Sequence, residues 1–157
     1  MLRQDNTHSW LNPRSIMGQL YLTTFDAFDW FLLLLWFTAI VYPIVYSYRN
    51  KTPIALGISV ALLLGYIVQY TFRVLVLYDI QPQFVWNDFW LIPNRLDSLS
   101  HVHTLFTAGF LHSMGDVTHV LGNVLVIAMV GIPLEQRLGT KRFTVIYVAG
   151  LLGGSVA

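Results

Sequence analysis

The sequence predicts an all-α membrane protein, a polytopic helical bundle, and three observations support this fold class. Of its 157 residues, 55% are hydrophobic and only 11% are charged, whereas soluble domains carry about 25% charged residues. Long, nearly uncharged apolar runs recur along the chain, and they lack the two-residue alternation of a barrel strand. Inside a lipid bilayer the backbone must hydrogen-bond to itself, so such runs predict helices.

Four apolar runs define the expected helices: Trp30 to Tyr48, Ile54 to Phe72, Val117 to Leu134 and Phe143 to Ala157. At a rise of 1.5 Å per residue, the first three cross or nearly cross a hydrocarbon core of about 30 Å. The fourth covers roughly 22 Å and stays apolar up to its last residue. We therefore expect the chain to be a fragment that stops within this helix.

The runs divide the chain into three parts. Residues 1–29 form a polar or interfacial N-terminal segment without the short apolar core of a signal peptide. Residues 30–48 form one transmembrane helix, and residues 54–157 form a helical domain with a long outer loop at 78–116. In that loop the aromatic stretch 84–93 is typical of a segment lying in the membrane interface. The apolar stretch 105–111 is too short to cross.

The basic residues predict the orientation in the membrane. Two short loops, 49–53 and 135–142, hold five of them: Arg49, Lys51, Arg137, Lys141 and Arg142. Cytoplasmic loops carry an excess of Lys and Arg, so we expect both loops in the cytoplasm and the N-terminus outside, most simply in a cell membrane. The net charge is only +1 and the chain lacks a basic run, which argues against nucleic acid as a partner. Without cysteine, thiol catalysis and iron–sulfur clusters are excluded.

Polar residues at the start of the third predicted span raise the question of function. His119 and Asn123 are four residues apart, so a helix places them on one face. Polar side chains inside a span are costly and mark functional sites, and an amide and an imidazole can both donate to a developing oxyanion. His112, seven residues before His119, could join them. The alternative is a pair of interhelical hydrogen bonds, worth about 0.6 kcal/mol each.

The sequence from Phe106 to Ala157 resembles the rhomboid family of intramembrane serine proteases. The motifs that carry this resemblance are His112, the His-x-x-x-Asn pair at 119 and 123, the Gly-x-x-x-Glu-x-x-x-Gly run at 131–139 with Arg137 inside it, and Tyr147, Gly150 and Gly154. The resemblance implies that 54–157 is a partial rhomboid domain containing core helices one to three. The helix at 30–48 is then an added N-terminal helix.

The resemblance also implies roles for single residues. His119 and Asn123 would stabilise the oxyanion, and His112 would be a further polar group of the catalytic site. Glu135 and Arg137 would be structural, joining the inner end of the third span to its neighbours. In the family, a serine nucleophile and a histidine base lie on later helices. We therefore expect the 157-residue chain to be inactive alone, and to need the remainder of the rhomboid bundle.

The implied substrates are transmembrane proteins within the lipid bilayer, and neither a cofactor nor a metal is expected. Ser155 lies where the family has helix packing, so we do not expect it to be a nucleophile. Where the family often has a Trp-Arg pair before the first histidine, this sequence has His103 and Thr104.

Two other functions remain open. One is a catalytically inactive rhomboid-like protein that binds membrane clients. The other is a metal-binding or haem-binding membrane protein, for which the candidate ligands are His101, His103, His112, Asp116 and His119. Their spacing matches no standard zinc signature.

Overall fold

The computed structural model describes residues 27–77, 102–112 and 116–156, and these residues form helices joined by short turns. In chain order the elements are α2 (Ala27–Arg49), α3 (Ile54–Leu77), α4 (Thr104–Thr107), the 3₁₀ turn η5 (Ala108–Phe110), α5 (Val117–Val126), the π-helical turn η6 (Ile127–Gly131), α6 (Ile132–Leu138) and α7 (Thr140–Val156). Within these described ranges there is no strand. The prediction of an all-α membrane helical bundle is confirmed.

Within the part of the chain that the structure describes, three helices are long and apolar enough to cross a membrane: Trp30–Arg49, Ile54–Phe72 and Val117–Leu138. They coincide with the first three predicted spans, and the protein is an integral membrane protein. The fourth predicted helix is also present, but as α7 it begins at Thr140 rather than Phe143. The reason is Gly139, whose φ of 80° ends α6 in a conformation suited to glycine and lets the chain turn at once into α7.

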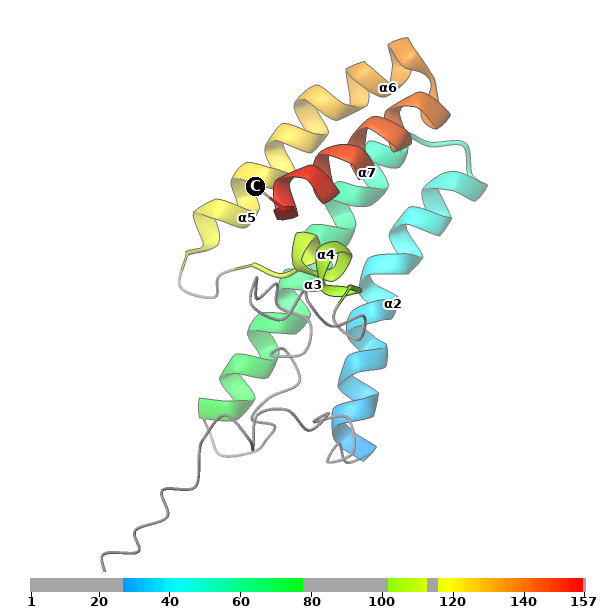
Figure 1. Cartoon of the computed structure of the whole chain (residues 1–157). Coiled ribbons are helices and arrows are strands. Elements are labelled where there is room, and N and C mark those ends of the chain that lie inside the picture. The colour runs from blue at the N-terminus through cyan, green and yellow to red at the C-terminus, as the bar shows by residue number, and fades with distance from the viewer. Residues whose placement is uncertain (1–26, 78–101, 113–115, 157) are drawn as a thin grey trace, which may run out of the picture.

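Helices α2 and α3 lie side by side (Figure 1), and small residues on α3 make this close approach possible. A Cβ atom on Gly57 would lie 2.7 Å from the Ser47 hydroxyl oxygen and 2.8 Å from the Pro43 carbonyl oxygen. Ala61, one turn further along α3, is completely buried, and Gly65 follows at the same four-residue spacing. Small residues at this spacing let two membrane helices pack backbone to backbone. Helix α2 is thus packed closely against α3.

The third span departs from the uniform α-helix that its composition predicts. Its middle turn, η6, is π-helical, and Pro133 follows at the start of α6. Proline lacks an N–H group, and its ring conflicts with the carbonyl four residues earlier, here that of Met129. A wider turn relieves this conflict, so we attribute η6 to Pro133. On the same turn Gly131 is buried, and a Cβ there would lie 3.2 Å from the Ala55 side chain.

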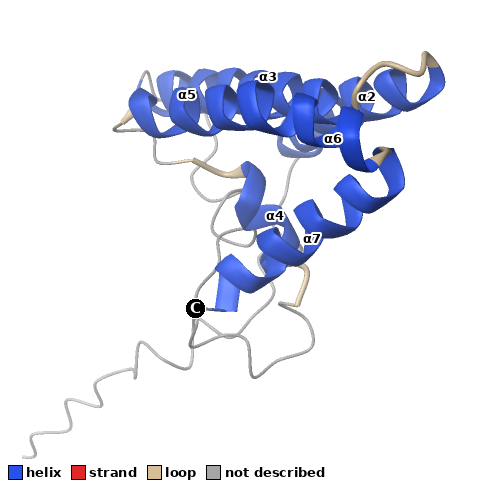
Figure 2. Cartoon of the chain, turned by 90° about the horizontal axis from the view of Figure 1, so that it is seen from above, coloured by secondary structure: helices blue, strands red, loops and turns tan. Residues whose placement is uncertain are grey.

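The elements form two layers. Figure 2 shows α2, α3 and α5 in one layer, with α4 and α7 on one side of it. The short segment α4–η5 packs on α7, where Gly109 lies directly against the side chain of Leu151. The prediction that 105–111 is too short to cross agrees with this short helix and turn. The aromatic stretch 84–93, His101 and nearly all of the predicted segment 1–29 lie outside the described residues.

Candidate active site

Asp116 sets the start of α5. It occupies the N-cap position, and one of its carboxylate oxygens accepts hydrogen bonds from the Thr118 backbone N–H, at 2.9 Å, and from the Thr118 hydroxyl. Both bonds hold the pKa of Asp116 below its usual value, and the bond from the Thr118 hydroxyl has the larger effect. An aspartate cap satisfies a backbone N–H that the first turn leaves unpaired. With α5 beginning at Val117, His119 falls in the first turn and Asn123 in the next.

Gln69 of α3 positions His112. Its side-chain N–H donates to the His112 carbonyl oxygen over 2.9 Å, and the His112 backbone N–H donates to the Gln69 Oε1 over 3.2 Å. Gln69 is completely buried. Its amide therefore satisfies both backbone groups of a residue whose neighbour, Leu111, is extended. Sequence reasoning missed Gln69, although a glutamine in the middle of a predicted span is itself a signal of a site.

The structure brings the three predicted site residues together. The Asn123 side-chain nitrogen lies 3.2 Å from Nε2 of His112 and 3.4 Å from Nε2 of His119. The two imidazole rings are 5.5 Å apart between centroids. An amide NH₂ group has two hydrogens, so it can donate one to each ring when both histidines carry their proton on Nδ1. Asn123 therefore bridges His112 and His119.

The two histidines lie in different environments. His112 is buried, with 3% of its surface exposed, whereas His119 is exposed. Burial, which penalises the charged imidazolium, is the main cause that lowers the pKa of His112. A backbone hydrogen bond with Phe110 partly opposes the shift, and repulsion from the His119 charge adds to it. His112 is therefore neutral at neutral pH and available as a hydrogen-bond acceptor.

A cavity of about 520 Å³ opens beside the three polar residues. It is lined by Leu62, Ala108, Gly109, Leu111, His112, His119, Asn123, Ile127, Tyr147, Gly150, Leu151 and Gly154. On the α7 side a Cβ added to Gly150 or Gly154 would meet no atom within 4 Å. The lining thus combines apolar side chains with a polar wall, formed by His112, His119 and Asn123, that carries hydrogen-bond donors. Its described lining contains no serine.

Glu135 anchors the far end of the third span. One carboxylate oxygen accepts from the Ile54 backbone N–H over 2.9 Å, and the other accepts from the Ala55 N–H over 2.8 Å. The Thr140 hydroxyl donates to the first oxygen over 2.8 Å. Because Ile54 and Ala55 begin α3, the carboxylate caps that helix across 81 residues of sequence. Glu135 thus joins α6 to α3 and α7. Arg137, expected to share this role, is exposed instead.

Four of the five proposed metal ligands are described by the structure, and these four do not gather into a site. Among the described residues, no three His, Cys, Asp or Glu side chains are close enough to hold a metal ion together. His103 is exposed at the start of α4, away from the bridge formed by Asn123. The described geometry thus offers no support for metal binding.

Comparisons with known proteins point to one family. Residues 99–157 match the Rhomboid domain family model. The chain is 32% identical over 74 residues to RHOMBOID-like protein 12, mitochondrial, of Arabidopsis thaliana, covering 47% of this chain and 21% of that protein. It is 31% identical over 75 residues to Rhomboid-like protein 16, chloroplastic, of the same plant, covering 45% of this chain and 23% of that protein. The matches thus span about a fifth of the length of these relatives. No solved structure matches the chain significantly.

Proposed function

Because residues 99–157 belong to the rhomboid family, we propose that the chain is the N-terminal part of an intramembrane serine endopeptidase that cleaves transmembrane proteins. His119 and Asn123 stabilise the oxyanion, and His112 supports Asn123. The serine nucleophile and the histidine base come from helices outside residues 1–157. Residues 54–157 are the first part of the rhomboid domain, and 30–48 is its added helix.

One observation carries the proposal: Asn123 bridges two imidazoles on the polar wall of a cavity that apolar side chains also line. Donors fixed in a site of low dielectric stabilise developing negative charge far better than donors in water. The contact with buried His112 is the shorter one, and the 3.4 Å contact with exposed His119 is the weaker. A substrate oxyanion can therefore replace His119 as the acceptor of Asn123, and His119 then stabilises the oxyanion through a ring nitrogen that carries a proton, while His112 keeps Asn123 in place.

The reaction then follows acyl transfer. The serine oxygen attacks the carbonyl carbon of the peptide bond, its proton passes to the base, and the carbonyl electron pair moves to the oxygen that Asn123 and His119 stabilise. Collapse of this intermediate expels the amine, which takes the proton from the base and leaves an acyl-enzyme. Water, activated by the same base, releases the second product.

The arrangement of the loops supports the proposed orientation. Loops 49–53 and 135–142 lie at the same end of the bundle (Figure 1) and line one cavity. Five basic residues concentrated at one end are typical of a cytoplasmic face. The site formed by His112, His119 and Asn123 lies toward the other end of the third span. We propose that it opens to the outside of a cell membrane.

The test uses the product of the complete reading frame, reconstituted with a transmembrane substrate. We expect cleavage, labelling by a serine-directed phosphonate, and a kcat lowered about 10²- to 10³-fold by Asn123→Ala. Leu121→Ala, an exposed position on the same helix, is the matched control and should leave kcat unchanged. If Asn123→Ala leaves kcat unchanged, Asn123 does not stabilise the oxyanion. Substrate binding without any cleavage or labelling would instead favour the inactive client-binding protein.

A further inference from the structure

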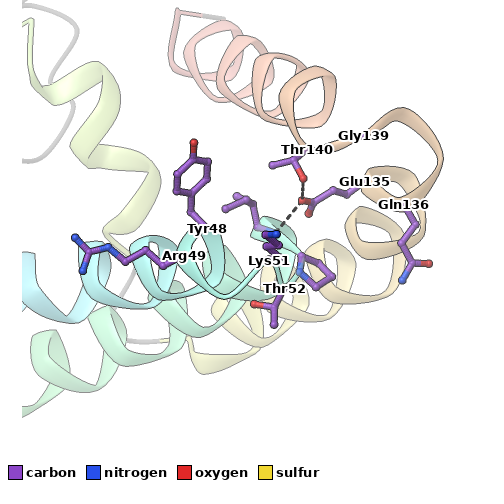
Figure 3. A pocket seen from close by; sticks show the side chains of 10 residues that line it. Tyr48, Arg49, Lys51, Thr52, Glu135, Gln136, Gly139 and Thr140 are labelled. Carbon is purple, nitrogen blue, oxygen red and sulfur yellow. Dashed lines mark hydrogen bonds between the residues drawn. The ribbon is translucent and has the colours of Figure 1, made fainter.

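A second cavity, of about 750 Å³, lies at the opposite end of the bundle, and we propose that it binds the phosphate headgroup of an anionic phospholipid. Figure 3 shows Tyr48 and Arg49 on its α2 side and Glu135, Gln136 and Thr140 on the other. The cavity lies between the α2–α3 turn and the α6–α7 turn. It therefore involves the added N-terminal helix and is separate from the candidate active site.

The lining of this cavity carries uncompensated positive charge. Arg49 and Lys51 are exposed, and within the described residues neither side chain pairs with a carboxylate. The single acidic residue of the lining, Glu135, is only 4% exposed, and both of its oxygens already accept hydrogen bonds. Its charge is thus directed into the protein. Guanidinium and ammonium groups are the side chains that bind phosphate oxygens best.

The depth of the cavity points to a lipid. One candidate span of the structure ends at Arg49 and the next begins at Ile54, so the turn between them lies at the level of the headgroups. Tyr48 is exposed there, as tyrosines at membrane interfaces often are. Basic pockets between transmembrane helices at this depth bind anionic headgroups. Among phosphate ligands, a membrane-embedded lipid is the one that is always present at this position.

The backbone of Lys51 gives a second observation. Its φ of 55° lies in the left-handed region, where glycine and asparagine are favoured over lysine. Backbone bonds fix this turn, from Lys51 N–H to the Tyr48 carbonyl over 3.4 Å and from Thr52 N–H to the Ser47 carbonyl over 3.1 Å. This turn, which ends α2, fixes the backbone of Lys51 at the cavity, so its side chain starts from a defined position next to Arg49.

The experiment measures lipid binding to the purified chain in detergent by native mass spectrometry, with phosphatidylglycerol and phosphatidylcholine of the same acyl chains. We expect one phosphatidylglycerol to bind in preference to phosphatidylcholine. Arg49→Gln and Lys51→Asn should each weaken that binding about fivefold. Lys51→Asn should not lower the melting temperature, because asparagine suits the backbone there. Lys141→Gln is the matched control: Lys141 is basic, exposed and outside the cavity lining, so its loss should leave binding within about twofold.

Three results would overturn the proposal. The first is equal binding of both lipids. The second is an equal loss with Lys141→Gln, which would show diffuse attraction to a basic surface. The third is complete displacement of the lipid by inorganic phosphate at millimolar concentration, which would assign the cavity to a free anion. Arg49→Lys, which keeps the charge, should retain the preference for phosphatidylglycerol.

Discussion

The side-chain nitrogen of Asn123 lies 3.2 Å from Nε2 of His112, and two hydrogen bonds to Gln69 hold the backbone of His112 in turn. The polar wall of the candidate active site therefore depends on a chain of contacts from α3 through the segment before α5 to α5 itself. The proposed oxyanion donor is thus positioned by a residue on another span, and disturbing Gln69 should affect Asn123 indirectly.

Replacing Gln69 by leucine should destabilise the protein strongly. The change keeps much of the side-chain volume but leaves the N–H and carbonyl of His112 buried without partners, at about 1–3 kcal/mol for each group. We expect the free energy of unfolding in detergent to fall by about 2–4 kcal/mol. Thr71→Val is the control, because the Thr71 hydroxyl bonds only to the Ile67 carbonyl on an exposed face of the same helix. Similar losses in both variants would show that Gln69 has no special role.

Stability should decrease as the pH falls below about 6.5, because burial lowers the pKa of His112 from its ordinary value of 6.5. Well above pH 6.5 this imidazole is neutral in both the folded and the unfolded state, so its titration does not change the free energy of unfolding. Below 6.5 the unfolded chain takes up a proton that the folded state resists, so the free energy of unfolding falls until the pH passes the folded pKa. The charge on His119, which faces His112, adds to this loss.

Melting temperatures measured from pH 8 to pH 5 test this effect. The lowered pKa of Asp116 acts in another window, since its contribution is present above the ordinary value of 3.8 and is lost only at lower pH. His112→Asn should flatten the dependence between pH 6.5 and pH 5. If His112→Asn shows the same dependence of melting temperature on pH as the wild type, a group other than His112 causes that dependence.

The sequence predicted the helices well because their signal is local. Apolar runs with few charges indicate the spans regardless of what the spans pack against. Helices α2 and α3 each begin within three residues of the predicted start. The spacing of His119 and Asn123 likewise follows from one helix. Their meeting with His112 depends on contacts outside that helix; the seven-residue separation and the family resemblance suggested it, but no helical periodicity predicted it.

Other features depend on tertiary contacts and could not be read from local pattern. The bond from Glu135 to Ile54 joins residues 81 positions apart. The short α4 is stabilised by packing against α7 rather than by its own sequence, since four residues are too few for an independent helix. The π-helical turn before Pro133 was not predicted either, because the apolar composition of the third span indicates a uniform helix.

Glu135→Gln should lower stability although the two side chains have the same shape. Glu135 accepts from the N–H groups of Ile54 and Ala55 through different oxygens. Glutamine has one oxygen, so one of these N–H groups would face its NH₂ group, donor against donor. We expect a loss of about 1–3 kcal/mol in the free energy of unfolding, with Gln136→Ala, at the exposed neighbour, as the control. A loss of activity without a loss of stability would contradict the structural assignment.

Gly57→Ala should separate α2 from α3. The added methyl group would lie 2.8 Å from the carbonyl oxygen of Pro43, a backbone atom that can move only if the whole helix moves. Overpacking of this kind typically costs about 1–3 kcal/mol. The same change at Gly153 of α7, where a Cβ meets nothing within 4 Å, serves as the control and should be neutral or slightly stabilising, because alanine favours helix. The measurement is the thermal unfolding of both variants in detergent, which compares their stabilities directly. If Gly57→Ala were as stable as Gly153→Ala, α2 would not be packed closely on α3, and the cavity lined by Tyr48, Arg49 and Glu135 would lose one of its two walls.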